Sequence, residues 1–499
     1  MKFLLSSLLL PVSVQAFSAT HGAHRSIRTD LRAETNEVIE TVVEGVDDVE
    51  SKLELETNFV EKEEASVDEM QNIKAMHSSP AEYEEVTFKC DKNTQFWKDY
   101  NMDGNYQEAD FLNDVATVSS NFISKGSDAV GYWARHNARS GYFLGNAVLG
   151  TISSSLHERL RNAEQENNFA SAFSAKVIAG MLSEVALSYE QDYERIEQGK
   201  YKKPYDMYTQ NRQNNPFYFG QQTSRFISEA IGTIARRNRG TEDDKRTWLT
   251  DNPSTELYPD YYKTAFHYQT DGWMSQDSAN VYETSTETLF LGRQDAMQRT
   301  ALVPLVEFAN EMKDIGRPLK ILEVACGTGR FMTFARDNLP LDTEFTAVDL
   351  SPFYLDKARD NDKNWRNIRK GSESSDTKIA PATFIQAKAE DLPFEDEEYD
   401  AVICMYLYHE IPREIRAKAS AEMARVTKKG GKVILTDSYQ LGDRPGMNPF
   451  MKNFEKMNEP HYVDFIEDFL PLHFEKEGLV PDAKIFCSRT KTLSFTKPE

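Results

Sequence analysis

Residues 321–331 read Ile-Leu-Glu-Val-Ala-Cys-Gly-Thr-Gly-Arg-Phe, and they decide the fold. The stretch predicts an apolar strand with an acid, then a glycine-bearing loop, then a helix that begins near Arg330. Gly327 and Gly329 lack a Cβ, so the backbone can turn tightly and lie close to a ligand. The helix start adds unpaired N–H groups. A glycine-rich loop is also typical of a plain turn, so this pattern indicates a nucleoside-cofactor cradle only in combination with the neighbouring strands and helices.

A second strand that ends in an acid comes after this loop. Residues 345–348 form the strand, Asp349 lies at its tip, and Pro352 lies in the first turn of the next helix. In nucleotide-binding α/β folds, an acid at this place accepts hydrogen bonds from the hydroxyl groups of a bound ribose. The repeated order of strands and helices predicts an α/β domain. The further elements expected are strands over 383–386, 399–405 and 431–437, a helix over 413–427, a polar surface loop over 361–378, and a last hairpin from 483–488 and 492–496.

From about Leu302 to the C-terminus, these motifs resemble those of the class I S-adenosylmethionine-dependent methyltransferases, the broad group that includes the ubiquinone and menaquinone C-methyltransferases. The resemblance implies a Rossmann-like seven-stranded domain over 301–499. It also implies S-adenosyl-L-methionine as the cofactor. The cofactor-binding positions that the resemblance carries over are Glu323, Ala325, Gly327, Gly329, Asp349, Leu350, Ala389, Glu390 and Met405.

Two positions depart from the family pattern. The family has glycine where this chain has Ala325, and we expect this residue to keep φ below zero, because an alanine forced to positive φ costs about 1 kcal/mol. The family commonly has an acid where Lys388 stands, which leaves the Ala389 N–H and the Glu390 side chain as the contacts to adenine.

Nicotinamide dehydrogenases are the main competing class. Their fingerprint is G-x-G-x-x-G, and here Ala325 and Arg330 take the places of its first and last glycines. Without the third glycine, strand and helix cannot close around a pyrophosphate in the usual way. The sequence therefore favours the methyltransferase interpretation.

His409 is the candidate catalytic residue. It follows the fourth strand at the carboxyl end of the sheet, where ligands bind in open α/β folds, and a histidine can act as a general base near neutral pH. A histidine that packs under a lid without a chemical role is the alternative. Five further residues are candidates for acceptor binding: His267, Tyr268, Trp273, Tyr406 and Tyr439. The first three lie in an aromatic segment, and packing at a domain interface is an equal explanation for them.

Two regions precede the methyltransferase domain. Residues 83–240 read as a mostly helical domain, in which 224–238 carries apolar residues on one face. Residues 241–300 form an aromatic lid or connector. The apolar faces are interpreted as core, with peripheral membrane contact as the lesser alternative.

The charge distribution bears on partners. The net charge is −22, and about 14 acids against two lysines lie between Glu34 and Glu69, which predicts an acidic disordered spacer over 34–80. An acidic protein is poorly suited to a phosphate backbone, so nucleic acid is disfavoured as a partner. The nine histidines do not fall into ligand spacing, so no metal is expected.

The N-terminus predicts a two-part leader. Residues 1–16 have the charged, apolar and small-residue regions of a signal peptide, and 17–33 carry arginines among hydroxyl residues. The pair resembles the bipartite leader of algae with secondary plastids, which implies a plastid location. Secretion or an endomembrane location is the alternative.

The functional hypothesis is methyl transfer by in-line displacement to a small, lipid-soluble or aromatic plastid metabolite. In such a reaction the enzyme chiefly holds donor and acceptor close together. Two alternatives stay open at this point: a non-catalytic, cofactor-binding assembly or regulatory factor, and a protein methyltransferase. The oligomeric state is left open.

Overall fold

The computed structural model describes residues 71–100, 108–161, 175–207, 215–239, 258–263, 267, 269, 271–370, 379–452 and 458–499. The described residues from Ser79 onward belong to one compact unit. The predicted signal peptide (1–16), the transit-like segment (17–33) and most of the spacer (34–80) lie outside the described residues. The predicted domain boundaries therefore stay predictions.

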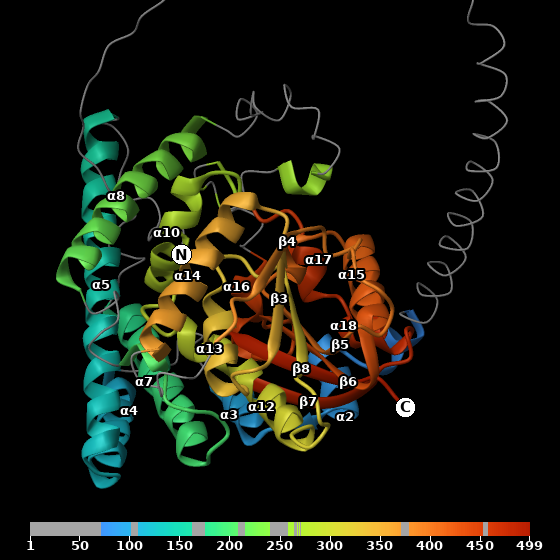
Figure 1. Ribbon diagram of the computed structural model, residues 1–499. Coiled ribbons are helices and arrows are strands. Elements are labelled where there is room, and N and C mark those ends of the chain that lie inside the picture. The colour runs from blue at the N-terminus through green and yellow to red at the C-terminus, as the bar shows by residue number, and fades with distance from the viewer. Residues whose placement is uncertain are drawn as a thin grey trace, which may run out of the picture. The chain divides into compact units, whose positions relative to one another are not determined.

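An eight-stranded sheet forms the centre of the unit (Figure 1), in the order β1-β7-β8-β6-β5-β2-β3-β4. Strand β8 is antiparallel to β6 and β7, and the other neighbours are parallel. The predicted Rossmann-like α/β fold is confirmed. The strands are β1 (Lys89–Cys90), β2 (Lys320–Val324), β3 (Glu344–Asp349), β4 (Thr383–Gln386), β5 (Tyr399–Met405), β6 (Thr427–Ser438), β7 (Val480–Cys487) and β8 (Thr490–Thr496).

The seven strands predicted for residues 301–499 are β2 to β8, and β1 is an eighth strand from outside that range. Strand β1 comes from the segment ahead of the methyltransferase domain and pairs in parallel with Ala483 and Lys484 of β7. A strand of two residues is too short to show an alternation of apolar and polar side chains, so the sequence could not predict it.

Alternating residues of the central strands build two hydrophobic cores, one on each face of the sheet. In β5, Val402 and Cys404 belong to one core, whereas Ala401 and Ile403 belong to the other. This alternation follows from the period of two along a strand. Helix α15 (Arg413–Val426) and α18 (Leu470–Glu475) cover the first face, and the second is covered by α12 (Leu302–Glu311), α13 (Arg330–Asn338) and α14 (Pro352–Lys370).

Helix α14 is longer than predicted. The surface loop predicted over 361–378 was wrong for residues 361–370, which continue the helix; residues 371–378 lie outside the described residues. Asn361 and Trp365 are buried, and the Asn361 amide donates to the Thr328 carbonyl at 2.8 Å. Their polar groups are satisfied by partners distant in sequence, which a local pattern cannot reveal.

Apart from β1, the segment ahead of the sheet domain is mostly helical where it is described. Its helices are α2 (Pro80–Thr87), α3 (Lys92–Asp99), α4 (Glu108–Ser124), α5 (Ser127–Arg161), α7 (Ala175–Glu197) and α8 (Pro216–Arg239). Two further helices, α10 (Gln276–Leu289) and α11 (Gln294–Gln298), follow before the sheet domain, and α10 contacts α5, α8 and α14 (Figure 1). Within the described part of the chain, none of the helices combines the length and apolar character needed to cross a bilayer.

Candidate active site

The glycine loop between β2 and α13 bends through three residues with positive φ. Ala325 has φ of 54°, Gly327 54° and Gly329 68°. The prediction that Ala325 would keep φ below zero was wrong. Ala325 begins the turn, and the next residue, Cys326, donates its N–H to the Val348 carbonyl at 2.9 Å. Pairing with the sheet therefore imposes the positive φ of Ala325 despite its cost for an alanine.

The two glycines serve different purposes. A Cβ on Gly329 would lie 2.9 Å from the Ala358 Cβ, so this glycine lets α13 and α14 approach each other. A Cβ on Gly327 would meet nothing within 4 Å, because this residue faces open space. Gly327 therefore leaves room for a ligand, whereas Gly329 supports packing.

Asp349 holds the loop in place. One carboxylate oxygen accepts from the Gly327 N–H and the other from the Ser351 N–H, both at 2.8 Å. Burial raises the pKa of Asp349 to about 6, although these hydrogen bonds oppose the shift. The carboxylate is therefore largely ionised at neutral pH and can accept further hydrogen bonds.

Asp349 lines the first of three cavities, here called the Asp349 cavity, of about 800 Å³. Three residues predicted to bind the cofactor, Leu350, Ala389 and Met405, also line it, together with Lys388. The carboxylate of Glu390 instead accepts a hydrogen bond from the Tyr261 hydroxyl at 2.8 Å.

Aromatic side chains from the predicted lid close this cavity. Tyr261, Tyr262 and Trp273 line it, and the Trp273 ring meets Tyr282 and Tyr354 edge to face at 5.6 Å between centroids. Trp273 thus lines the Asp349 cavity together with Tyr406, and its ring also meets His267 edge to face at 6.4 Å between centroids. Tyr268 lies outside the described residues.

The second cavity, the Glu323 cavity, has about 820 Å³ and also borders the glycine loop, from Ala325 to Thr328. Glu323 is 1% exposed, and its Oε2 has no hydrogen-bond partner among the described residues. Burial, with a contribution from Asp349, raises the pKa of Glu323 well above its usual range. A buried carboxyl without a partner fits a cationic ligand group at this position.

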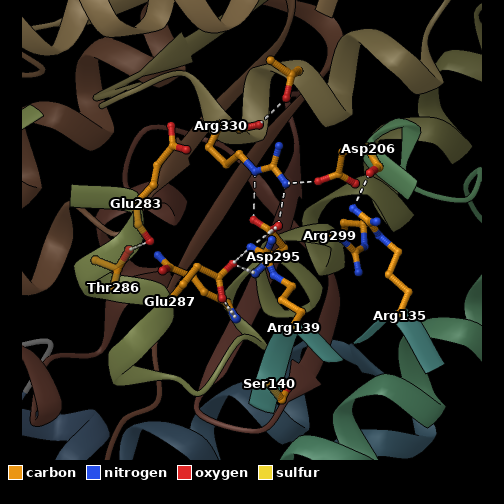
Figure 2. Close-up of polar contacts among 12 residues, drawn as sticks. Arg135, Arg139, Ser140, Asp206, Glu283, Thr286, Glu287, Asp295, Arg299 and Arg330 are labelled. Atoms are coloured by element: carbon orange, nitrogen blue, oxygen red, sulfur yellow. Dashed lines mark hydrogen bonds and ion pairs between the residues drawn. The ribbon is translucent and has the colours of Figure 1, made fainter. Parts of the chain in front are cut away.

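An ion-pair network joins the helical segment to the glycine loop (Figure 2). The Arg330 guanidinium, at the start of α13, pairs with Asp206 and Asp295, and Arg139 of α5 pairs with Asp295 at 2.9 Å and Glu287 at 2.7 Å. Burial lowers the pKa of Arg330, but the carboxylates outweigh it and raise the pKa well above its usual range. The sequence identified Arg330 only as a helix start, since its partners are distant in the chain.

The third cavity, the His409 cavity, has about 1150 Å³ and contains the predicted residues His267, Tyr406, His409 and Tyr439. His409 Nδ1 lies 2.6 Å from Asp437 Oδ1. Burial lowers the pKa of His409, but Asp437 outweighs it and raises the pKa to about 9. A histidine and carboxylate pair of this kind can take up a proton from a bound acceptor.

His267 is held by two acids, and one of them, Glu410, also lies 3.5 Å from His409 Nε2. The Nε2 of His267 lies 2.9 Å from Glu410 and its Nδ1 lies 3.0 Å from Glu459. Burial lowers the pKa of His267, but both carboxylates outweigh it and keep the imidazole charged. Glu410 adjoins His409 in the sequence, whereas no local signal links Glu459 to His267.

The three cavities meet at two tyrosines. Tyr282 and Tyr406 line all three, and Met405 lines both cavities beside the glycine loop. Tyr406 has φ of 53°, and its hydroxyl lies 2.8 Å from the Thr490 hydroxyl. The sequence pointed to Tyr406 through its place after a strand, whereas Tyr282 was missed. In the described part of the chain, no group of histidine, cysteine, aspartate and glutamate side chains could hold a metal ion.

This fold, with its glycine loop, acidic strand tip and adjoining cavities, defines a class I S-adenosylmethionine-dependent methyltransferase domain. Residues 321–431 match the methyltransferase domain family. An uncharacterised methyltransferase, YcgJ, from Bacillus subtilis (strain 168) is 31% identical over 148 residues, which cover 29% of this chain and 50% of that protein. Demethylmenaquinone methyltransferase from Staphylococcus aureus (strain MRSA252) is 28% identical over 131 residues, covering 26% and 48%. The chain spans about half the length of these curated relatives.

Solved structures are also similar to this chain. Magnesium protoporphyrin IX methyltransferase from Synechocystis PCC 6803 with bound SAM is 14% identical, covers 40% of this chain and 79% of its own, and has a TM-score of 0.27. A protein from Pyrococcus horikoshii OT3 is 19% identical, covers 40% and 90%, and also has a TM-score of 0.27. At these scores neither structure bears on the acceptor.

Proposed function

We propose that this protein transfers the methyl group of S-adenosylmethionine to a small-molecule acceptor bound in the His409 cavity. The observation that carries the proposal is the meeting of the three cavities at Tyr282 and Tyr406, with His409 on the acceptor side. Donor and acceptor held on opposite sides of this junction would satisfy the in-line geometry of a displacement.

Each side chain has a distinct task in this proposal. When bound, the cofactor supplies a methyl group on a positively charged sulfur. Asp349 accepts hydrogen bonds from the ribose, and Glu323 faces the ammonium of the amino-acid end. The lid tyrosines exclude water from the Asp349 cavity.

His409 receives the proton that a hydroxyl or an activated ring carbon must lose. Because Asp437 raises the pKa of His409 to about 9, the imidazole is mostly protonated at neutral pH and must first lose that proton. We therefore expect a reaction that accelerates toward alkaline pH. Once neutral, His409 is a stronger base than an unperturbed histidine.

The lining of the His409 cavity favours an aromatic or lipid-soluble acceptor with a polar group. Tyr282, Tyr462, Leu289 and Phe290 supply apolar surface. The Tyr439 hydroxyl is buried there and has no hydrogen-bond partner among the described residues. The similarity to a demethylmenaquinone methyltransferase supports a ring-bearing acceptor, and the predicted leader supports a plastid location.

Incubation of the full chain with methyl-labelled donor and a lipid extract of plastids tests the proposal. We expect label in a small, organic-soluble product, and no such product from His409→Gln protein. Cofactor binding without a labelled product would favour the non-catalytic factor, and label confined to protein would favour a protein methyltransferase. Either outcome would contradict the proposal.

A further inference from the structure

The Glu323 cavity contains a cluster of buried polar atoms without partners among the described residues. These atoms are Nε2 of Gln222, Oε1 of Gln294, Oε1 of Gln298 and Oε2 of Glu323. Gln222 is 2% exposed, Gln294 6% and Glu323 1%. Buried polar groups are nearly always hydrogen-bonded in folded proteins, so four in one cavity indicate a polar ligand.

The cluster matches the hydrogen-bonding pattern of an α-amino acid. An ammonium has three donors, and the cavity offers three acceptors: Glu323 and the amide oxygens of Gln294 and Gln298. A carboxylate needs donors, and Gln222 Nε2 supplies one. The Arg139 guanidinium lines the same cavity and adds positive charge beside its partners Glu287 and Asp295.

The surrounding contacts hold the Gln222 side chain and the backbone at the start of α11 in place. The Thr284 hydroxyl donates to Gln222 Oε1 at 3.4 Å, which directs the amide nitrogen away from α10. The backbone N–H of Gln294 donates to Glu287 at 3.3 Å, and Glu287 belongs to the network of Figure 2. Gln222 and the helix that carries Gln294 and Gln298 are thus positioned before any ligand arrives, which lowers the ordering cost of binding.

We propose that Gln222, Gln294 and Gln298 bind the amino-acid end of S-adenosylmethionine together with Glu323. This inference rests on the proposed function and deepens it, because three of the four residues lie outside the matched segment 321–431. Gln222 belongs to α8, and Gln294 and Gln298 belong to α11. The helices ahead of the methyltransferase domain are then part of the cofactor site.

Two ligands that share the adenosine and differ at the amino-acid end test this proposal. S-Adenosylhomocysteine carries the amino-acid end, whereas 5′-methylthioadenosine lacks it. Calorimetry on the full chain should find the first ligand bound at least about tenfold more tightly than the second. In Gln222→Leu and Gln298→Leu proteins, affinity for S-adenosylhomocysteine should fall about tenfold while affinity for 5′-methylthioadenosine changes less than about twofold.

Gln191→Leu is the matched control. Gln191 is also buried, but its amide oxygen accepts from the Trp97 indole at 2.7 Å, and it lines none of the three cavities. This variant should leave the ratio of the two affinities unchanged, and thermal unfolding reports any loss of folding. A ratio near one in the wild type, or an unchanged ratio in both cavity variants, would overturn the inference.

These outcomes are separable from failure of the proposed function. If the wild type binds neither ligand, both proposals fall. If S-adenosylhomocysteine binds and its advantage in affinity over 5′-methylthioadenosine is lost in the variants, the inference stands even when no acceptor becomes methylated.

Discussion

The two cavities that border the glycine loop are built in different ways. The polar lining of the Asp349 cavity comes from the sheet domain. It consists of Asp349 at the tip of a strand, the turn at Gly327 and the backbone near Ala389. The Glu323 cavity owes its polar wall mainly to side chains of α5, α8, α10 and α11. A nucleoside site can be assembled from one local motif, whereas the second site needs helices from distant parts of the chain.

This difference bears on how the chain relates to similar proteins. The matched segment 321–431 contains Asp349 and Ala389 but neither Gln222 nor Gln294. Adenosine recognition is therefore expected to follow the family, while recognition of the amino-acid end is expected to combine the family position Glu323 with residues from outside the matched segment.

The largest effect we expect is on the rate of methyl transfer, and it should occur without a change in cofactor binding. His409→Gln should lower kcat at least about a hundredfold, because the proton acceptor is lost, and leave the affinity for S-adenosylhomocysteine unchanged. Steady-state kinetics and calorimetry measure the two quantities. His461→Gln, outside all three cavities, is the control. Equal kcat in the two variants would remove His409 from the mechanism.

The network that joins the helices to the glycine loop should matter for stability. Arg330→Met leaves the buried Asp206 and Asp295 carboxylates without this partner and should lower the free energy of unfolding by about 3 kcal/mol. Arg359→Met removes an exposed pair with Asp356 and should cost less than about 1 kcal/mol. Denaturant-induced unfolding of the two variants measures both changes in the free energy of unfolding. Similar values would show that the network does not hold the two regions together.

The rise in activity from pH 7 to 9 should arise from His409. With a pKa of about 9, neutral His409 becomes roughly tenfold more abundant per pH unit from pH 7 upward, and kcat/KM should follow. Asp437→Asn removes the carboxylate that raises this pKa, so the rise should move toward the ordinary histidine value of about 6.5. A profile that is flat from pH 7 to 9 in the wild type would argue against a general base.

Substitution of Asp349 should weaken the binding of both adenosine-containing ligands to the same extent. Asp349→Ala removes an acceptor for the ribose and loosens the Gly327 turn, so both S-adenosylhomocysteine and 5′-methylthioadenosine should weaken by at least about tenfold. Gln222→Leu should weaken only the first. If Asp349→Ala also separated the ligands, the division between the two cavities would be wrong.

The sequence predicted the parts of the site that depend on short local patterns. The loop from Glu323 to Gly329 and the acid Asp349 could be found because apolar runs, glycines and an acid recur at fixed places along an alternating chain. His409 and Tyr406 followed from their place after a strand. Such signals lie within a few residues of each other and do not depend on the rest of the fold.

The remaining features depend on tertiary packing. The positive φ of Ala325 is imposed by pairing with β3, and the length of α14 by partners of Asn361 and Trp365. Gln222 and Gln294 are ordinary polar residues on helices until folding buries them around one cavity. Glu459 meets His267 only because the lid reaches the sheet domain.

A crystal structure of the full chain with S-adenosylhomocysteine tests the central claim most directly. The account predicts adenosine in the Asp349 cavity, with the ribose bonded to Asp349, and the amino-acid end in the Glu323 cavity within hydrogen-bond distance of Glu323 and Gln222. The sulfur should lie beside Tyr282 and Tyr406. A ligand bound elsewhere, or an amino-acid end directed into solvent or into the His409 cavity, would contradict it.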